Sequence, residues 1–127
     1  MWRVAIYARE GPGRSGRARL DRQVAELTAQ VARQPEWWPV ATYADQLAGI
    51  GRPGLSRLVA DAPASLDVVA VDGYGRLSSD RRELEALLAQ LGGAGVRVVV
   101  LQPSAGRRFA RLVANVALAD LIGEAAR

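Results

Sequence analysis

Four apolar runs rich in β-forming residues alternate with helical segments, and this alternation most constrains what the chain can fold into. Each run is closed by Gly, Pro, Asp or Arg, and the predicted strands are Arg3 to Ala8, Val40 to Asp45, Leu66 to Asp72 and Arg97 to Leu101. Strand and helix in turn imply right-handed crossovers and a mainly parallel sheet with helices on both faces. The sequence therefore predicts an α/β fold.

The segments between these runs are predicted to be helices. Apolar residues repeat at helical intervals from Leu20 to Val31 and from Leu84 to Leu91, and a short helix is expected to open at Pro53. The first helix is predicted to begin near Leu20. A loop rich in Gly and Arg would then connect it to the first strand.

The last segment has apolar residues on more than one helical stripe, so its helix would have a second apolar face that one sheet cannot cover. We expect a long C-terminal helix that forms a homodimer, and the alternative is a wide stripe that faces only the core of its own chain. At 127 residues the chain is expected to be a single domain, residues 1–127. The predicted dimer contacts are made by Phe109, Leu112, Val113 and Val116.

Histidine and cysteine are both absent. Their absence excludes disulfides, zinc fingers, cysteine nucleophiles and histidine acid–base catalysis, so we expect no metal and no cofactor. Chemistry would have to come from arginine, carboxylates, hydroxyls or the backbone. No apolar run approaches the roughly 18 residues that a membrane span needs, so we expect a cytoplasmic protein without membrane contact.

Positive charge is concentrated near the N-terminus. All 17 basic residues are arginines, against 13 acids, for a net charge of +4. Uniform use of arginine is also what a GC-rich genome would produce, but residues 9–22 hold five arginines against Glu10 and Asp21. Guanidinium groups match phosphate oxygens bidentately, which favours a polyanion as partner.

Three arginines follow successive predicted strands or the loops after them: Arg9, Arg52 and Arg76. In α/β sheets, ligands bind at the carboxyl ends of the strands. A cluster of arginines there can hold a phosphodiester and stabilise the charge that develops in phosphoryl transfer.

Several short motifs occur in a fixed order along the chain. They are YAR at 7–9, LDRQ at 20–23, YAD at 43–45, GRPGLSRLVADA at 51–62, DVVAVDGYGRLSSDRRELEALLAQL at 67–91 and GVRVVVL at 95–101. The ordered set resembles the catalytic domain of the serine recombinases, the resolvase and invertase family, over about residues 3 to 122. The resemblance implies a mostly parallel sheet of four or five strands, a long dimer-forming helix, and cutting of both DNA strands by attack of a serine on the phosphodiester.

The resemblance also implies which residues surround the phosphate. Arg9, Arg52 and Arg76 match family arginines, and Gln23 matches the glutamine of the Leu-x-x-Gln motif, so these four are the expected phosphate- or DNA-binding residues. Gly11, however, stands where the family has its serine nucleophile. Further departures are at Gly75, where the family has aspartate, and at Ser79, where it has a second arginine.

These departures leave three interpretations of function. The first is a dimeric regulatory or DNA-backbone-binding module that cannot cleave DNA, because glycine cannot form a phosphoserine link. The second is an active, divergent recombinase that uses another hydroxyl, such as Ser15 in the predicted loop, within an extended reach of roughly 14 Å. The third is a purely structural dimerisation module. Family members normally continue into a DNA-binding region, and we expect none after residue 127.

One further alternative concerns the two serines of the segment GRLSSD at 75–80. Ser78 and Ser79 could serve as nucleophiles, but "SSD" is also typical of a helix start. If Asp80 is the N-cap, Glu83 falls at the capping-box position.

Overall fold

A parallel sheet with helices on both faces forms the body of the protein. The computed structural model describes residues 1–47 and 51–101. The strands are β1 (Trp2–Glu10), β2 (Trp37–Gln46), β3 (Val68–Val71) and β4 (Arg97–Val100). The helices are α1 (Gly13–Ala32), α2 (Pro53–Ser65) and α3 (Arg81–Gly93), and a short 3-10 turn, η1, covers Tyr74–Arg76.

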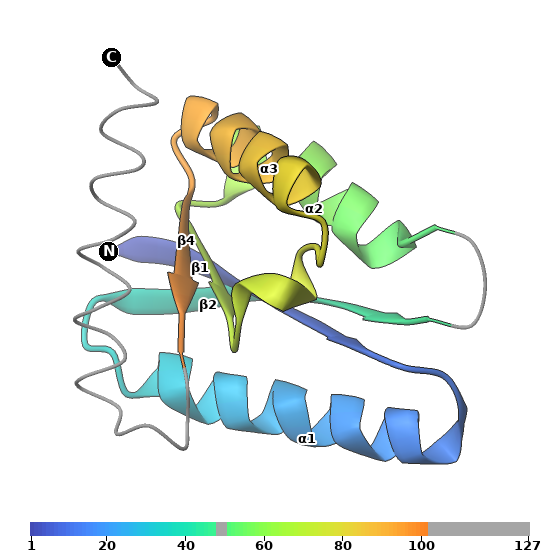
Figure 1. Cartoon of the computed structure of the whole chain (residues 1–127). Helices are drawn as coiled ribbons and strands as arrows, with labels where there is room; N and C mark the ends of the chain where they lie inside the picture. Colours follow the sequence, from blue (N-terminus) through green and yellow to red (C-terminus); the bar gives the residue numbers. More distant parts are fainter. Residues whose placement is uncertain (48–50, 102–127) are drawn as a thin grey trace.

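The sheet has the strand order β2-β1-β3-β4, and each of its three pairings is parallel. Because β1 lies inside the sheet, the chain reaches β2 on one side through α1 and then crosses to β3 on the other side. Because every pairing is parallel, the carboxyl ends of all four strands lie at the same end of the twisted sheet. Figure 1 shows β1 and β2 running in the same direction side by side, and they end at Glu10 and Gln46.

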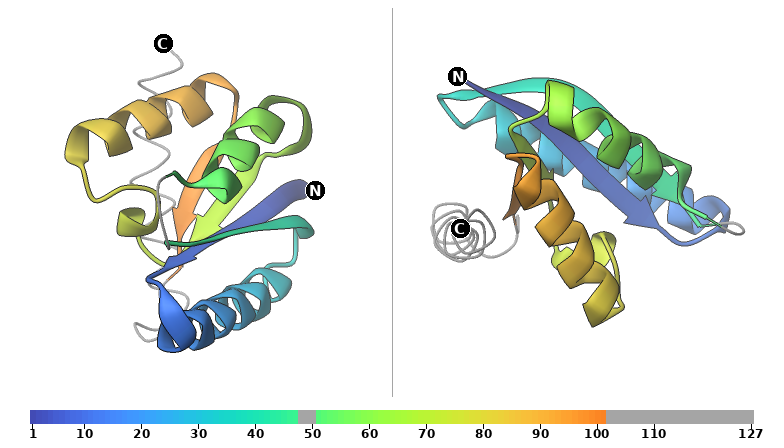
Figure 2. Two further views of the ribbon diagram at one scale, coloured as in Figure 1. Left: turned by 90° about the vertical axis from the view of Figure 1, so that its right-hand side faces the viewer. Right: turned by 90° about the horizontal axis from the view of Figure 1, so that it is seen from above.

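Helices cover the two faces unequally. Helix α1 packs on one face against β1 and β2, while α2 packs against β2 and α3 against β4 on the other face. Figure 2 shows α1 on one side of the strands and the α2 and α3 pair on the opposite side. The predicted α/β class with a mainly parallel sheet and helices on both faces is thus confirmed.

The core lies between these layers. It is built mainly from the central strands β1 and β3, whose residues Val4–Ala8 and Val68–Val71 are buried, and from apolar side chains of the three helices. Fully buried large side chains include Tyr7, Leu27, Leu58, Leu77 and Leu91. Within the described ranges, none of the helices combines the length and the apolar character that crossing a membrane requires.

Several element boundaries differ from the sequence prediction. Strands β1 and β2 are longer than expected, and β2 already begins at Trp37 rather than at Val40. Strand β3 is shorter than expected, since only Val68–Val71 pair in the sheet. Helix α1 begins at Gly13 rather than near Leu20. The arginines and alanines after Gly13 are good helix formers, and Gly13 takes the φ of +84° that the sharp entry requires. The predicted C-terminal dimer helix lies outside the described residues.

Candidate functional site

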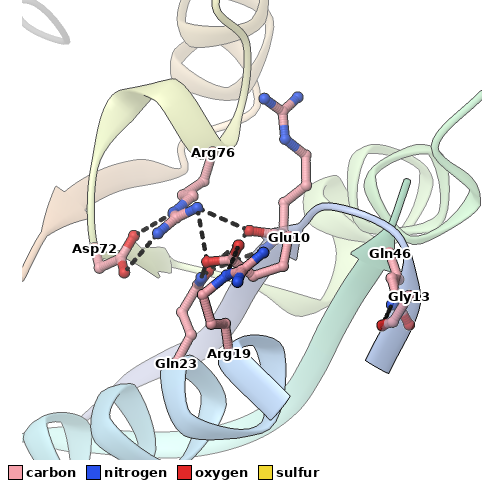
Figure 3. A network of polar contacts seen from close by, with 8 residues as sticks. Glu10, Gly13, Arg19, Gln23, Gln46, Asp72 and Arg76 are labelled. Atoms are coloured by element: carbon pink, nitrogen blue, oxygen red, sulfur yellow. Dashed lines mark hydrogen bonds and ion pairs between the residues drawn. The ribbon is translucent and has the colours of Figure 1, made fainter. Parts of the chain in front are cut away.

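The ends of β1, β2 and β3 place polar side chains at one edge of the sheet. Glu10 closes β1, Asp45 lies one residue before the end of β2, and Asp72 follows β3. The η1 turn lies at the same edge and connects β3 to α3. Figure 3 shows that Arg76 of η1, Glu10 of β1 and Arg19 of α1 meet there.

The three predicted arginines gather around the η1 turn. Arg9 Nη2 donates to the carbonyl oxygen of Gly75 at 3.0 Å. Arg52 donates to the carbonyl oxygen of Leu77, directly after the turn. Arg76 belongs to the turn itself. The structure therefore brings together side chains that lie 67 residues apart in sequence, and each of them already has a protein acceptor.

Arg76 has the most partners. Its Nε donates to Asp72 Oδ1 at 2.7 Å, and its Nη1 lies 2.9 Å from the carbonyl oxygen of Arg9 and 3.2 Å from Glu10 Oε2 (Figure 3). The hydrogen bond to Asp72, together with the charges of Asp72 and Glu10, raises the pKa of Arg76 above its usual value against the opposing effect of burial. The guanidinium is a permanent cation held by two carboxylates.

Glu10 is the central counter-charge of this cluster. Its Oε1 lies 3.2 Å from Arg19 Nε, and its Oε2 accepts from Gln23 Nε2 at 3.2 Å as well as pairing with Arg76. Burial acts to raise the pKa of Glu10, but the hydrogen bond from Arg19 and the charges of Arg76 and Arg19 outweigh it, and the pKa lies below its usual value. Glu10 therefore stays ionised and neutralises part of the positive charge of Arg19 and Arg76.

Gln23 holds the backbone of β1. Its Oε1 accepts from the N–H of Arg9 at 2.9 Å, and its Nε2 donates to the carbonyl oxygen of Arg9 at 3.2 Å. The side chain thus pairs with the end of β1 as a neighbouring strand would, beyond the point where β3 ends its pairing at Ile6. Buried Gln23 positions Arg9, and the sequence prediction of a direct phosphate contact is not tested by this geometry.

Arg52 connects the start of α2 to the start of α3. Besides its bond to Leu77, it forms an ion pair with Glu83. Asp80 is the N-cap of α3, accepting from the N–H groups of Arg82 at 2.8 Å and Glu83 at 3.1 Å. The predicted N-cap at Asp80 is confirmed. The N–H of Asp80, which Glu83 would accept from in a capping box, donates instead to Ser78 Oγ at 3.0 Å. The Glu83 carboxylate pairs with Arg52.

Asp45 of β2 anchors the first turn of α2. Its carboxylate accepts from the Tyr7 hydroxyl at 2.7 Å and from the N–H groups of Gly54 at 2.7 Å and Leu55 at 2.9 Å. Burial, together with the hydrogen bond to Asp45, raises the pKa of Tyr7 far above its usual value, so the phenol stays protonated. Through this contact the end of β2 determines where Arg52, the residue before α2, is held.

Gly11 lies between the end of β1 and the start of α1. A Cβ built there meets no atom of the described residues within 4 Å, and the φ of Gly11 is not in the left-handed region. Gly16 differs, because its Cβ would lie 2.0 Å from the carbonyl oxygen of Gly11. The first turn of α1 therefore needs glycine at 16, whereas residue 11 has room for a side chain. Gly75 likewise has open space around its Cβ position.

The candidate hydroxyls are placed differently from one another. Ser15 lies exposed in the first turn of α1, not in a loop as predicted. Ser78 is buried, and its Oγ bonds to the backbone of Asp80. Ser79 is exposed and precedes the cap. The backbone of Ser15 is therefore held in a helix. The extended reach that was predicted for Ser15 assumed that it lies in a loop.

An open recess of about 360 Å³ borders this cluster, lined by Asp72, Gly73, Gly75 and Arg76. Its walls carry a cation and a carboxylate that pair with each other. In the part of the chain that the structure describes, no group of three or more acidic side chains is gathered where it could hold a metal ion.

Sequence reasoning did not anticipate the carboxylates that hold the arginines. Glu10, Asp72 and Glu83 each pair with one of the predicted arginines. The sequence indicated one of these pairs, because Asp72 and Arg76 have the four-residue spacing that is typical of a local ion pair. The pairing of Arg52 with Glu83, 31 residues away, depends on the packing of α2 beside α3.

Comparison with known proteins identifies the family. The sequence profile of the family described as "Resolvase, N terminal domain" matches residues 4–122. The chain belongs to this family. The resolvase-type domain thus falls in the serine recombinase group and in the DNA-recombination class, as the ordered motifs predicted.

Solved structures agree with this assignment. The resolvase-type domain is 31% identical to the C-terminal catalytic domain of IS1535 TnpA, an IS607-like serine recombinase, with a TM-score of 0.63 over 92% of this chain and 97% of that one. It is 26% identical to the corresponding domain of ISC1926 TnpA, with a TM-score of 0.70 and coverage of 90% and 77%. The N-terminal catalytic domain of TP901-1 integrase is 25% identical, with a TM-score of 0.68 and coverage of 94% and 90%. No curated protein matched the chain at a significant level.

Proposed function

We propose that this resolvase-type domain binds the DNA backbone without cutting it, and acts as a dimeric regulatory or scaffolding module of a recombination-type assembly. The single observation that carries the proposal is Gly11 at the position of the family nucleophile, next to a cluster of arginines that has been retained. An arginine cluster can still bind phosphate, but glycine has no oxygen to attack it.

Two further positions support the loss of cleavage. Gly75 and Ser79 stand where the family has an aspartate and a second arginine. Groups that act as one catalytic unit are strongly non-additive, so the loss of several of them removes most of the rate. Arg9, Arg52 and Arg76 remain as the phosphate-binding residues of the proposal, with Gln23 holding Arg9 in position.

An active enzyme that uses Ser15 is the competing function. Its hydroxyl projects from the first turn of α1, and it would have to reach a phosphate bound at the arginines. Displacement of a nucleophile by about 1 Å can cost roughly a hundredfold in rate. A purely structural dimerisation module is the third candidate, and it requires that the domain does not bind DNA at all.

The deciding experiment incubates supercoiled DNA with the wild-type chain, Gly11→Ser and Gly11→Ala, and looks for nicking and covalent protein–DNA adducts. We expect no adduct with the wild type or with alanine, and at most a trace with serine because Gly75 and Ser79 remain. Since residue 11 has free space, all three chains should fold equally well. A phosphoserine adduct at Ser15 in the wild-type chain would overturn the proposal.

The dimeric part of the proposal depends on the sequence alone, because residues 109–122 lie outside the described part. The double variant Val113→Asp with Val116→Asp would place uncompensated charge in the predicted contact. Sedimentation of this double variant should then show a monomer. A wild-type chain that is already monomeric at tens of micromolar would contradict the prediction.

A further inference from the structure

We infer that the outward face of α1, through Arg14 and Arg22, is the main surface by which this domain contacts the phosphate backbone of duplex DNA. The inference rests on the proposed function, since it names where the backbone binds. It concerns residues outside the arginine cluster at the strand ends, and it commits to DNA rather than to any other polyanion.

The arginines of the strand-end cluster already have acceptors within the protein. Arg76 is held by Asp72 and Glu10, Arg52 pairs with Glu83, and Arg9 donates to a carbonyl oxygen. A phosphate that binds there must displace these acceptors or share their donors. Part of the cluster's charge is therefore already neutralised by the protein.

The arginines on the outward face of α1 differ from those of the cluster. Arg14 and Arg22 are exposed, and among the residues that the structure describes their side chains have no hydrogen-bond or ion-pair partner. Arg17 on the same surface pairs only with Asp21, at 3.3 Å, and both side chains are 67% exposed. Such a solvated pair is weak and can be exchanged for a phosphate. Among the described residues, no carboxylate has to be displaced from Arg14 or Arg22.

The spacing of Arg14 and Arg22 on the helix fits the spacing of phosphates along a DNA strand. Residues eight positions apart on a helix lie about 80° apart around its axis and about 12 Å apart along it. One strand of duplex DNA advances about three to four nucleotides over that length. Ala18 and Ala25 are exposed on the same face, and their short side chains leave the arginines as the projecting groups. Arg14 and Arg22 can therefore reach separate phosphates of one strand.

The surrounding residues favour DNA over a lipid surface. Membrane-binding helices present large apolar side chains such as Trp, Phe or Leu beside their basic residues. The large apolar side chains Leu20, Leu27 and Val31 of α1 are buried against the sheet. The outward face is left with arginine, alanine and a few polar or acidic residues.

The test measures binding of a labelled duplex of arbitrary sequence by fluorescence anisotropy over a range of salt concentrations. The variant is Arg14→Ala with Arg22→Ala. Its matched control is Arg57→Ala with Arg82→Ala, which removes the same charge from exposed residues of α2 and α3 on the opposite face. We expect the α1 variant to bind roughly tenfold more weakly, with a salt slope shallower by about 2, and the control to change affinity by less than about twofold.

The remaining outcomes separate the inference from the proposed function. Equal loss in both double variants would mean a general charge effect and would overturn the inference. The inference would also be overturned if the wild-type chain bound phosphatidylserine vesicles more tightly than the duplex. If the wild type binds DNA and only Arg9→Ala weakens it, the inference fails while the proposed function stands. If the wild type does not bind duplex DNA at low salt, both fail.

Discussion

The arginines at the strand ends and the arginines on the outward face of α1 carry the same charge, yet the protein holds them in different ways. Arg52 and Arg76 each contact a carboxylate and a carbonyl oxygen, and the backbone of Arg9 is clamped by buried Gln23. Arg14 and Arg22 extend into solvent, with no ion pair among the described residues. The first group is oriented but partly neutralised, whereas the second has no partner in the described part of the chain and is not oriented.

This difference separates two requirements of acting on DNA. Chemistry at a phosphate needs cations held in fixed positions, whereas attachment to the backbone needs only accessible charge. Under the proposed function, the strand-end cluster has oriented cations but no serine at residue 11, and the accessible charge lies beside it on α1. Substitutions at the strand ends and on α1 test how firmly the protein holds the first region and how much charge remains accessible in the second.

The largest effect is expected from Asp45→Ala. The change leaves the buried Tyr7 hydroxyl and the N–H groups of Gly54 and Leu55 without their acceptor, so the free energy of unfolding should fall by roughly 3 kcal/mol or more. Asp21→Ala removes only a solvated pair on α1 and should cost less than about 0.5 kcal/mol. Urea denaturation of both variants gives the comparison, and similar losses would mean that Asp45 does not anchor α2.

A smaller effect is expected where α1 meets the strand ends. Gly16→Ala places a methyl group 2.0 Å from the carbonyl oxygen of Gly11, so the helix must move and stability should fall by roughly 2 kcal/mol. Gly11→Ala meets no described atom within 4 Å and should change stability by less than about 0.5 kcal/mol. Thermal unfolding measures both. A Gly16→Ala chain as stable as wild type would show that this contact is not tight.

The smallest effect concerns affinity. Glu10→Gln removes the counter-charge of Arg19 and Arg76 and should tighten binding of duplex DNA by about threefold, the scale of one surface ion pair. Glu26→Gln makes the same change of charge on exposed α1, where Glu26 has no ion pair among the described residues, and should have a smaller effect. Weaker binding by Glu10→Gln would mean that Glu10 orients Arg76 for phosphate rather than competing with it.

The pH dependence of binding provides an independent check on Glu10. Its pKa is lowered in the folded protein, so its ion pairs are fully present above the ordinary glutamate range and are lost only as the pH falls through the lowered folded value. Wild-type affinity should therefore show no step due to Glu10 near neutral pH. The difference between wild type and Glu10→Gln should stay constant from pH 6 to 8 in anisotropy titrations.

Much of the fold could be predicted because its signals are local. The four apolar runs correspond to β1 to β4, Pro53 opens α2, and Asp80 caps α3. The start of α1 was predicted too late, because glycines and arginines between residues 11 and 19 suggested a loop. Packing of Gly16 against Gly11 and the bond from Gln46 Nε2 to the carbonyl oxygen of Gly13, 2.7 Å long, hold that turn against the strand ends.

The candidate site was predicted in its positions but not in its contacts. Parallel strands must end at one edge, so Arg9, Arg52 and Arg76 could be brought together from the strand order alone. The acceptors of these arginines could not be predicted. A guanidinium can reach several carboxylates, and differences of a few ångströms in separation decide which one it pairs with. The pairing of Arg52 with Glu83 and of Arg76 with Glu10 required the actual placement of η1 and α3.

The sequence by itself determined the α/β class, the recombinase family and the absence of an oxygen at residue 11, since each depends on residue identity and order. Only the tertiary structure decided which arginines pair with a carboxylate and which have no such partner among residues 1–47 and 51–101. Charge is a property of the residue, but its availability depends on the distance to the nearest counter-charge, which the folded chain sets for Arg76 and leaves open for Arg14.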